Sequence, residues 1–104
     1  MADTRDLKGK KVTVLGLGIS GYESALFLQK KGARVFVSEI AQNEAFLGYR
    51  QKLNDRGIEM EVGRHSMDRI LESDWVVISP GIKPRSEIYQ TLWNQKKDAL
   101  ISEI

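Results

Sequence analysis

The chain has 104 residues, of which 41% are hydrophobic and 29% charged, a balance typical of one soluble globular domain. Sixteen lysine and arginine residues against fourteen aspartate and glutamate residues leave a formal net charge of +2, which is too small to indicate a nucleic-acid-binding surface. The lack of cysteine and the single histidine exclude disulfides, thiol catalysis, iron–sulfur clusters and a multi-histidine metal centre.

The first half of the chain predicts two strand–helix units. Residues 11–15 are rich in strand-forming residues and lead directly into glycines, and residues 22–31 then show helical spacing. A second strand is predicted over 34–38 and a second helix over 44–55, with Gly57 as its C-terminal stop.

The third unit is shorter and more polar. Residues 58–62 alternate apolar side chains with Glu59 and Glu61, a pattern typical of an edge strand. A short helix is predicted to follow, with Ser66 as its N-cap.

The last part of the chain carries the most apolar run. Residues 74–79 therefore predict a central parallel strand. Ser86 is expected to cap a fourth helix that buries Ile88 and Leu92, and residues 99–104 to form a fifth strand.

Five strands separated by four helices predict an α/β fold, a Rossmann-like, doubly wound parallel sheet of order 3-2-1-4-5 in one domain over 1–104. Ligands of such sheets bind at the carboxyl ends of the strands where the order reverses, between strands one and four. The N-terminus is polar, and no apolar run of about 18 residues occurs. We therefore expect neither a signal peptide nor a membrane span, and a cytoplasmic location.

A G-x-G-x-x-G pattern follows the first strand and opens the first helix, which is the context that makes this pattern informative. Gly16 permits the tight turn, Gly18 lets a ligand approach the main chain, and Gly21 lets the helix pack near the strand. The N–H groups of Ile19, Ser20 and Gly21 then favour a phosphate or diphosphate. The alternative is a sharp turn without a ligand.

Glu39 lies 18 residues after Gly21, near the place where Rossmann domains hold a ribose with an acid. Its carboxylate would accept hydrogen bonds from ribose hydroxyls or from the N3–H of a uracil. The alternative is a solvated carboxylate at a strand end.

The fourth strand leads into a Pro80–Gly81 turn that should face the glycine turn across the same crevice. Ser79 and the Gly81 N–H are expected to donate to the diphosphate from that side. Lys83 and Arg85 would either add positive charge nearby or be ordinary solvated cations.

Three further side chains are given structural roles. His65 has no histidine, cysteine or acidic partner at ligand spacing, so we expect a capping or edge residue and not a metal ligand or catalyst. Trp75 and Trp93 lie on apolar stretches and are expected in the core.

The segments 12–21, 76–82 and 101–104 together resemble the N-terminal domain of the Mur ligases of peptidoglycan (cell-wall) synthesis, in particular those that add D-glutamate. The resemblance covers nearly the whole chain. The glycine pattern alone is unspecific, but its combination with a Ser-Pro-Gly-Ile turn and a terminal Ser-Glu-Ile is much more specific.

This resemblance implies a domain that binds the UDP part of UDP-N-acetylmuramoyl-L-alanine. In the family, the main chain at the positions of Ile19 and Ser20 meets the diphosphate, and the turn over 79–81 lies beside it. The positions of Glu39 and Ile40 border the uracil. Some members carry a hydroxyl residue where this chain has Ile40, so here we expect packing against the base.

The family's reaction uses ATP and magnesium to turn a substrate carboxylate into an acyl phosphate, which the amine of D-glutamate attacks. The chain contains no G-x-x-x-x-G-K-[ST] motif, because its only Gly-Lys pair, Gly9–Lys10, is followed by Lys11. The resemblance therefore implies that this chain is the N-terminal part of a longer ligase, with ATP and magnesium bound by further domains of the same enzyme. We expect no catalytic residue, bound cofactor, metal, nucleic acid or membrane here, and a monomer.

Two other functions are compatible with parts of the pattern. An NAD(P)-binding domain of a dehydrogenase, or a nucleotide-sensing module, would use the glycine turn and Glu39. It would leave the turn over 79–81 and the terminal Ser-Glu-Ile unexplained. A ligand-free scaffold that acts through protein contacts is the third possibility.

Overall fold

The computed structural model describes residues 7–16, 18–41, 44–79 and 82–102. Strands and helices alternate through these segments. Their bounds are β1 (Lys11–Leu15), α1 (Gly18–Lys30), β2 (Arg34–Glu39), α2 (Ala45–Asp55), β3 (Glu59–Val62), α3 (Met67–Leu71), β4 (Trp75–Ile78), α4 (Glu87–Lys96), the 3-10 turn η1 (Lys97–Ala99) and β5 (Leu100–Ser102).

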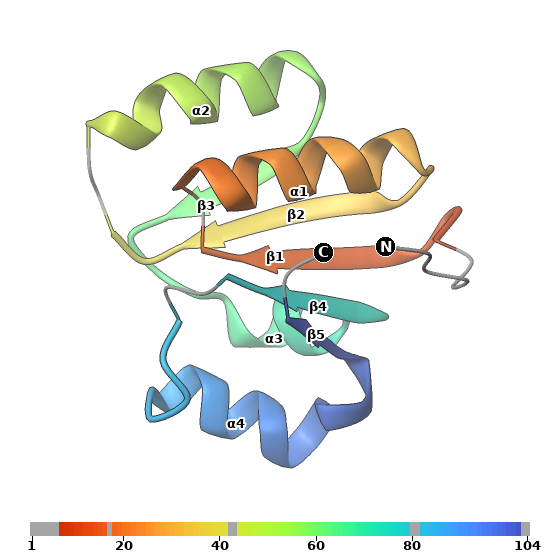
Figure 1. Cartoon of the computed structure of the whole chain (residues 1–104), viewed down its shortest axis with the longest axis vertical. Helices are drawn as coiled ribbons and strands as arrows, with labels where there is room; N and C mark the ends of the chain where they lie inside the picture. The colour runs from red at the N-terminus through yellow and green to blue at the C-terminus, as the bar shows by residue number, and fades with distance from the viewer. Residues whose placement is uncertain (1–6, 17, 42–43, 80–81, 103–104) are drawn as a thin grey trace.

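The strands form one five-stranded sheet of order β3-β2-β1-β4-β5. Every neighbouring pair is parallel, so the predicted topology is confirmed. All carboxyl ends therefore lie along one edge, on the left in Figure 1. The strand order reverses between β1 and β4, which is the predicted ligand-binding position.

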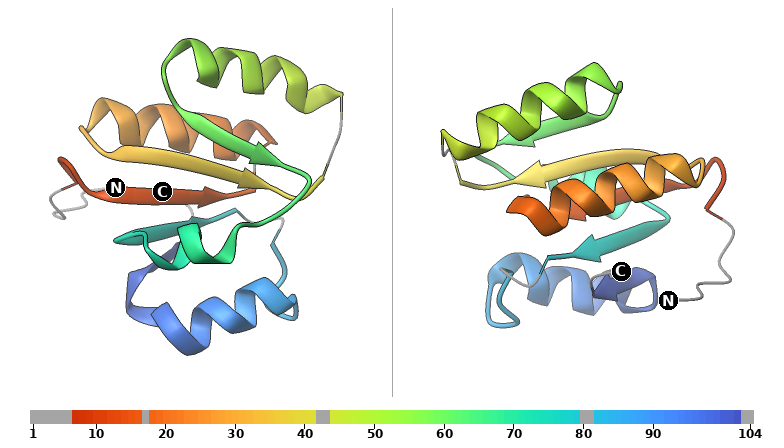
Figure 2. Two further views of the ribbon diagram at one scale, coloured as in Figure 1. Left: turned by 180° about the vertical axis from the view of Figure 1, so that it is seen from behind. Right: turned by 45° about the horizontal axis from the view of Figure 1, so that its top comes forward.

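The helices cover both faces of the sheet. In Figure 1 α1 lies in front of the strands, and in the reverse view of Figure 2 α3 comes forward instead. Two buried clusters follow from this arrangement. One joins Val12, Val14 and Val77 to residues of α1 and α2, and the other joins Leu15 to residues of α3 and α4.

The central strands are apolar on both sides because both sides are covered. In β4, Val77 belongs to the cluster under α1, whereas Val76 and Ile78 belong to the cluster under α3 and α4. All three side chains are at most 6% exposed. This two-sided burial explains the continuous apolar run that predicted a central strand.

Element boundaries differ from the predictions at the ends of helices and strands. The first helix begins at Gly18, because the glycine turn itself forms its first turn and not only the approach to it. The fifth strand covers Leu100–Ser102, since residues 97–99 form a 3-10 turn. Of the predicted terminal Ser-Glu-Ile, Glu103 and Ile104 lie outside the described residues.

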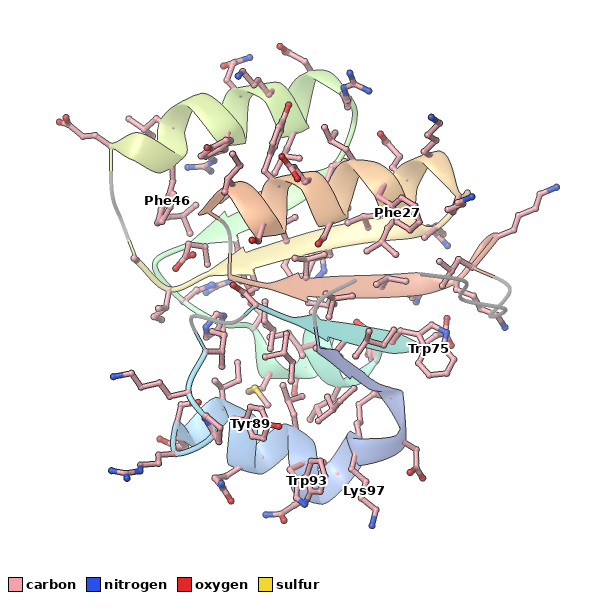
Figure 3. The ribbon with its side chains drawn as sticks, in the orientation of Figure 1. Phe27, Phe46, Trp75, Tyr89, Trp93 and Lys97 are labelled. Atoms are coloured by element: carbon pink, nitrogen blue, oxygen red, sulfur yellow. The ribbon has the colours of Figure 1, made fainter. Side chains whose placement is uncertain are left out.

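The prediction that Trp93 lies in the core is wrong. Its side chain is 50% exposed, and its ring stacks along α4 on Tyr89, with ring centroids 6.4 Å apart (Figure 3). Leu92 occupies the buried stripe of this helix, and the next residue points about 100° away from it. Trp75 is half-buried and packs against the cluster under α1.

Within the segments that the structure covers, no helix has the length and apolar character needed to cross a membrane.

Candidate functional site

The turn after β1 packs directly against the turn after β4. The main-chain N–H of Gly16 donates to the Ser38 carbonyl at 2.9 Å, and that of Ser79 donates to the Leu15 carbonyl at 3.0 Å. A Cβ built on Gly16 would lie 2.7 Å from the Ser79 Cβ and 3.8 Å from Ile82 Cγ1. The absence of a side chain at Gly16 thus lets the two turns meet at the carboxyl edge, as predicted.

Gly21 is required for another contact. A Cβ at this position would lie 2.2 Å from the carbonyl oxygen of Gly16 and 3.7 Å from Val14 Cγ1. The Gly16 carbonyl belongs to the main chain and cannot rotate away as a side chain would. The first turn of α1 therefore reaches the end of β1 only because residue 21 is glycine.

The start of α1 lies open beside this turn. Gly18 is its first residue and has a φ of +56°, and a Cβ there would meet nothing within 4 Å. Ile19 is 64% exposed, and Ser20 is half-buried. Main-chain N–H groups in a first helical turn have no partner within the helix. The first turn of α1, all of which the structure describes, contains no acidic residue. The positive end of the helix dipole is therefore not neutralised by a side chain of this turn.

A main-chain hydrogen bond joins the two described ends of the turn after β4. The N–H of Ile82 donates to the Ser79 carbonyl at 3.0 Å. Ser79 is half-buried at this edge. Pro80 and Gly81, the other two predicted site residues of this turn, lie outside the described residues.

Glu39 ends β2, as predicted, and it is not a solvated carboxylate. It is 8% exposed, and its Oε2 accepts the N–H of Ala41 at 2.8 Å. Its carbonyl accepts the N–H of Gly63 at 2.7 Å, which ties the ends of β2 and β3 together. Ile40, the next residue, is 54% exposed, so it offers an apolar surface at the strand end.

A groove of about 810 Å³ runs along the carboxyl edge from the end of β2 to the start of α4. Pockets of this size accommodate small organic ligands. Ile82 lines the groove and also lies beside Gly16, so the groove adjoins the glycine turn. Its described lining residues are Ile40, His65, Met67, Ile82, Lys83, Arg85, Ser86, Glu87, Ile88 and Thr91.

Lys83 and Arg85 both lie on the wall of this groove and are exposed. Glu87 stands on the same wall, so the charge there is mixed. Ser86 caps α4 as predicted, since its Oγ accepts the N–H of Tyr89 at 3.3 Å. The structure thus brings the two cations to the groove without giving them a specific role.

A cluster of polar side chains joins the ends of β2 and β3 to the start of α3. Ser38 and Glu61 are register partners in the sheet, and the Ser38 hydroxyl lies 2.7 Å from Glu61 Oε2 and 2.6 Å from His65 Nδ1. Ser66 donates to Glu61 twice, from its N–H at 2.7 Å and from its hydroxyl at 2.5 Å. We call Ser38, Glu61, His65 and Ser66 the polar cluster.

The polar cluster changes two predicted roles. Ser66 is the N-cap residue of α3 by position, but its hydroxyl makes no capping hydrogen bond because it donates to Glu61. His65 stands at the edge of the sheet, as expected, and its ring contacts Ser38 instead of capping α3.

Hydrogen bonding and burial shift the pKa values of two cluster members. Burial alone would raise the pKa of Glu61, but hydrogen bonds from the Ser66 N–H, the Ser66 and Ser38 hydroxyls and Arg64 together hold it below its ordinary value of 4.5. Burial lowers the pKa of His65 below its ordinary 6.5, and attraction to Glu61 and Glu39 only partly offsets this. Near neutral pH the pair is a carboxylate and a neutral imidazole.

Sequence reasoning did not assign Ser38, Glu61 or Ser66 to a site. The alternation in 58–62 predicted an edge strand, and within that strand the Glu61 side chain is only 13% exposed. The signal in the sequence was limited to one polar residue near the end of each predicted strand, Ser38 and Glu61, the second of which lies four residues before His65. No group of three or more histidine, cysteine, aspartate or glutamate side chains in the described segments is placed to hold a metal ion.

Comparison with known proteins identifies a family match over most of the chain. Residues 10–100 match the family described as "Mur ligase MurD-like, N-terminal domain". Among curated proteins, the UDP-N-acetylmuramoylalanine–D-glutamate ligase of Pelodictyon phaeoclathratiforme is 44% identical over 99 residues, which are 95% of this chain and 20% of that protein. The chain spans about a fifth of the length of the curated relatives that it matches, between 17% and 22%.

Two solved structures share the fold. UDP-N-acetylmuramate–alanine ligase MurC from Thermotoga maritima superposes with a TM-score of 0.67 at 22% identity, over 89% of this chain and 20% of that one. The precorrin-2 dehydrogenase SirC superposes with a TM-score of 0.65 at 16% identity, over 100% of this chain and 52% of that one. At these identities the superpositions show the fold alone, and they include both a ligase and a dehydrogenase.

Proposed function

Because this chain belongs to the family of MurD-like N-terminal domains of Mur ligases, we propose that it binds the UDP part of UDP-N-acetylmuramoyl-L-alanine. In this proposal it serves a longer ATP-dependent ligase that adds D-glutamate to that substrate in peptidoglycan synthesis, with the remaining ligase domains in the same chain. The names of the relatives support this reaction.

The open start of α1 is the proposed diphosphate site. The N–H groups of Ile19 and Ser20 lie in the first turn of the helix, where N–H groups lack helical partners, and that of Gly21 lies beside them; the helix dipole there also favours an anion. Gly18 has nothing within 4 Å of its Cβ position, so a phosphate can approach the main chain closely. Ser79 borders Gly16 from the other side. We assign Pro80 and Gly81 to the same diphosphate site from the sequence pattern alone.

The groove beside the glycine turn is the proposed nucleoside site. Glu39 would accept hydrogen bonds from the uridine, since a carboxylate has about four lone-pair sites and can accept further bonds beside the one from Ala41. Ile40 would pack its exposed side chain against the flat face of the base. Diphosphate and nucleoside would thus occupy adjoining parts of one crevice.

The described residues do not provide the phosphoryl-transfer chemistry. ATP and magnesium need a phosphate-binding loop with lysine and a hydroxyl residue, and the sequence has no such motif. This chain would therefore hold and orient the substrate through its nucleotide end, while the remaining domains carry out acyl-phosphate formation and amide formation.

Beside the family match, one structural observation supports the proposal. The start of α1, which has no acidic residue, adjoins a groove of ligand size where the strand order of the sheet reverses. The test is a calorimetric titration of the chain with UDP, UDP-N-acetylmuramoyl-L-alanine and NADH. We expect both uridine ligands to bind more tightly than NADH. Equal or tighter binding of NADH would favour the dehydrogenase-type function, and no binding of any nucleotide would favour a scaffold.

A matched pair of glycine variants locates the site. Gly18 and Gly57 both have positive φ, at +56° and +75°, with nothing within 4 Å of the Cβ position. Alanine should cost each a similar amount of stability, about 1–2 kcal/mol. Only Gly18→Ala should weaken UDP binding, by about tenfold or more, because its methyl group occupies the phosphate approach. Equal UDP affinities of the two variants would place the diphosphate elsewhere.

A further inference from the structure

His65 belongs to the polar cluster and also lines the groove of the proposed nucleoside site. Its ring has two nitrogens with different environments. Nδ1 contacts the Ser38 hydroxyl at 2.6 Å. No described group hydrogen-bonds Nε2, and no buried side-chain nitrogen or oxygen of the described segments lacks a partner. Nε2 must therefore be accessible to solvent.

The hydrogen-bond directions in the cluster follow from proton counting. Glu61 accepts from Ser66 twice and is a carboxylate, so it has no proton to give. The Ser38 hydroxyl has one proton and two acceptors in reach, Glu61 Oε2 at 2.7 Å and the Arg64 carbonyl at 3.3 Å, and it donates to the nearer, charged carboxylate. His65 Nδ1 must then carry its own proton and donate to the Ser38 oxygen. The chain of donors runs from His65 through Ser38 to Glu61.

This series of hydrogen bonds selects one tautomer of the neutral imidazole. When Nδ1 carries the proton of a neutral ring, Nε2 has a free lone pair and is a hydrogen-bond acceptor. Burial favours the neutral ring by lowering the pKa of His65, against the opposing attraction of Glu61 and Glu39. Ser38 is fully buried and fixes the ring orientation, so the acceptor at Nε2 is held in place.

We propose that His65 is a specificity-determining residue of the nucleotide site, whose Nε2 accepts a hydrogen bond from the uridine part of the ligand. The inference rests on the proposed UDP site and adds a second acceptor beside Glu39. A uridine carries donors at N3–H and at its ribose hydroxyls, so two acceptors at the same strand ends match its chemistry. The apolar side chains of Ile40 and Met67 flank the same groove and suit the faces of the base.

Two substitutions of His65 separate ligand contact from positioning. Asparagine places its amide near the position of Nδ1 and retains a donor for Ser38, but it has no counterpart of Nε2. Glutamine reaches the position of Nε2 with an amide oxygen and gives up the Ser38 contact. We expect His65→Asn to weaken UDP binding by about three- to tenfold, the range for one neutral hydrogen bond, and His65→Gln to bind UDP more tightly than His65→Asn.

Modified ligands identify the donor. UDP methylated at N3, 2′-deoxy-UDP and 3′-deoxy-UDP each lack one candidate donor. One of these three changes should lose its effect on affinity in His65→Asn, because the partner is already missing. Full effects of all three changes in that variant, or weaker UDP binding by His65→Gln than by His65→Asn, would overturn the inference.

The tautomer of the His65 imidazole can be measured in the absence of ligand. Nitrogen-15 spectra of the labelled chain at neutral pH should show a protonated Nδ1 and an unprotonated Nε2 for His65. A proton on Nε2 would overturn the inference even if UDP binds. If UDP affinity is lost in Gly18→Ala but unchanged in His65→Asn, only the role of His65 fails. If the wild-type chain does not bind UDP at all, the proposed function fails as well.

Discussion

Gly21 tolerates no side chain, whereas Gly18, three residues earlier, faces open space. The same sequence pattern thus contains one glycine needed for packing and one that leaves room for a ligand. Substitutions at the two positions should therefore affect different properties, stability at the first and binding at the second.

Gly21→Ala should lower the free energy of unfolding by about 1–3 kcal/mol, because the new methyl group would overlap the Gly16 carbonyl, a main-chain atom. Gly48 is the control: it lies in α2, is exposed, and has nothing within 4 Å of its Cβ position. Gly48→Ala should raise stability by about 0.5–1 kcal/mol through helix propensity. Urea unfolding followed by circular dichroism measures both, and a harmless Gly21→Ala would contradict the proposed packing.

At the residue scale, the sequence predicts some of the candidate site and misses the rest for a physical reason. The glycines are visible because a turn and a close contact are local requirements. The role of Glu61 depends on its register with Ser38, two elements away in the chain. An alternating pattern indicates which residues share a face, but it does not show that a glutamate on one face meets a serine and a histidine there.

At the element scale, two serines in equivalent positions behave differently. Ser86 caps α4 with its hydroxyl, whereas the hydroxyl of Ser66, also an N-cap by position, bonds Glu61. The sequence rule locates both helix starts, but tertiary contacts decide which bond forms. The helix and strand order was predictable for the converse reason, because parallel strands covered on both faces need long apolar runs that are visible in sequence.

A buried hydrogen bond connects β1 to the segment between α3 and β4. The Thr13 hydroxyl bonds the Ser73 hydroxyl, and Ser73 in turn donates to the Arg69 carbonyl at 3.3 Å. Thr13 and Ser73 are 1% and 4% exposed. Thr13→Val should cost about 1–3 kcal/mol because it removes the only hydroxyl partner that the structure gives to Ser73.

The double variant Thr13→Val with Ser73→Ala checks this interpretation. It should be less destabilised than the sum of the two single variants, since neither hydroxyl is left facing an apolar replacement, and the Arg69 carbonyl loses its Ser73 donor equally in Ser73→Ala and in the double variant. Thermal unfolding of the four proteins gives the comparison. Strict additivity would mean that the hydroxyl pair contributes nothing.

At the scale of the whole molecule, the sheet separates a carboxyl edge, where the candidate site residues gather, from an amino edge without them. The polar cluster at the carboxyl edge also makes stability depend on pH. The pKa values of both His65 and Glu61 are lowered in the folded chain. On acidification the unfolded chain therefore binds protons first, so the folded state loses stability as the pH falls.

We expect full stability above about pH 6.5, a decline below it as His65 titrates, and a further decline below about pH 4.5 from Glu61. Urea unfolding from about pH 8 to about pH 4 measures the profile. His65→Asn should flatten the upper part, and Glu61→Gln should flatten the lower part while costing stability near neutral pH. A variant profile parallel to that of the wild type would show that the residue does not titrate on unfolding.

The positions of the two tryptophans decide which optical signal suits these measurements. Trp75 begins β4 at the amino edge, and Trp93 lies on the exposed side of α4 (Figure 3). Neither lines the groove. Intrinsic fluorescence should consequently follow unfolding and remain almost silent when a nucleotide binds, so a titration by tryptophan emission would miss a ligand that calorimetry or nuclear magnetic resonance detects.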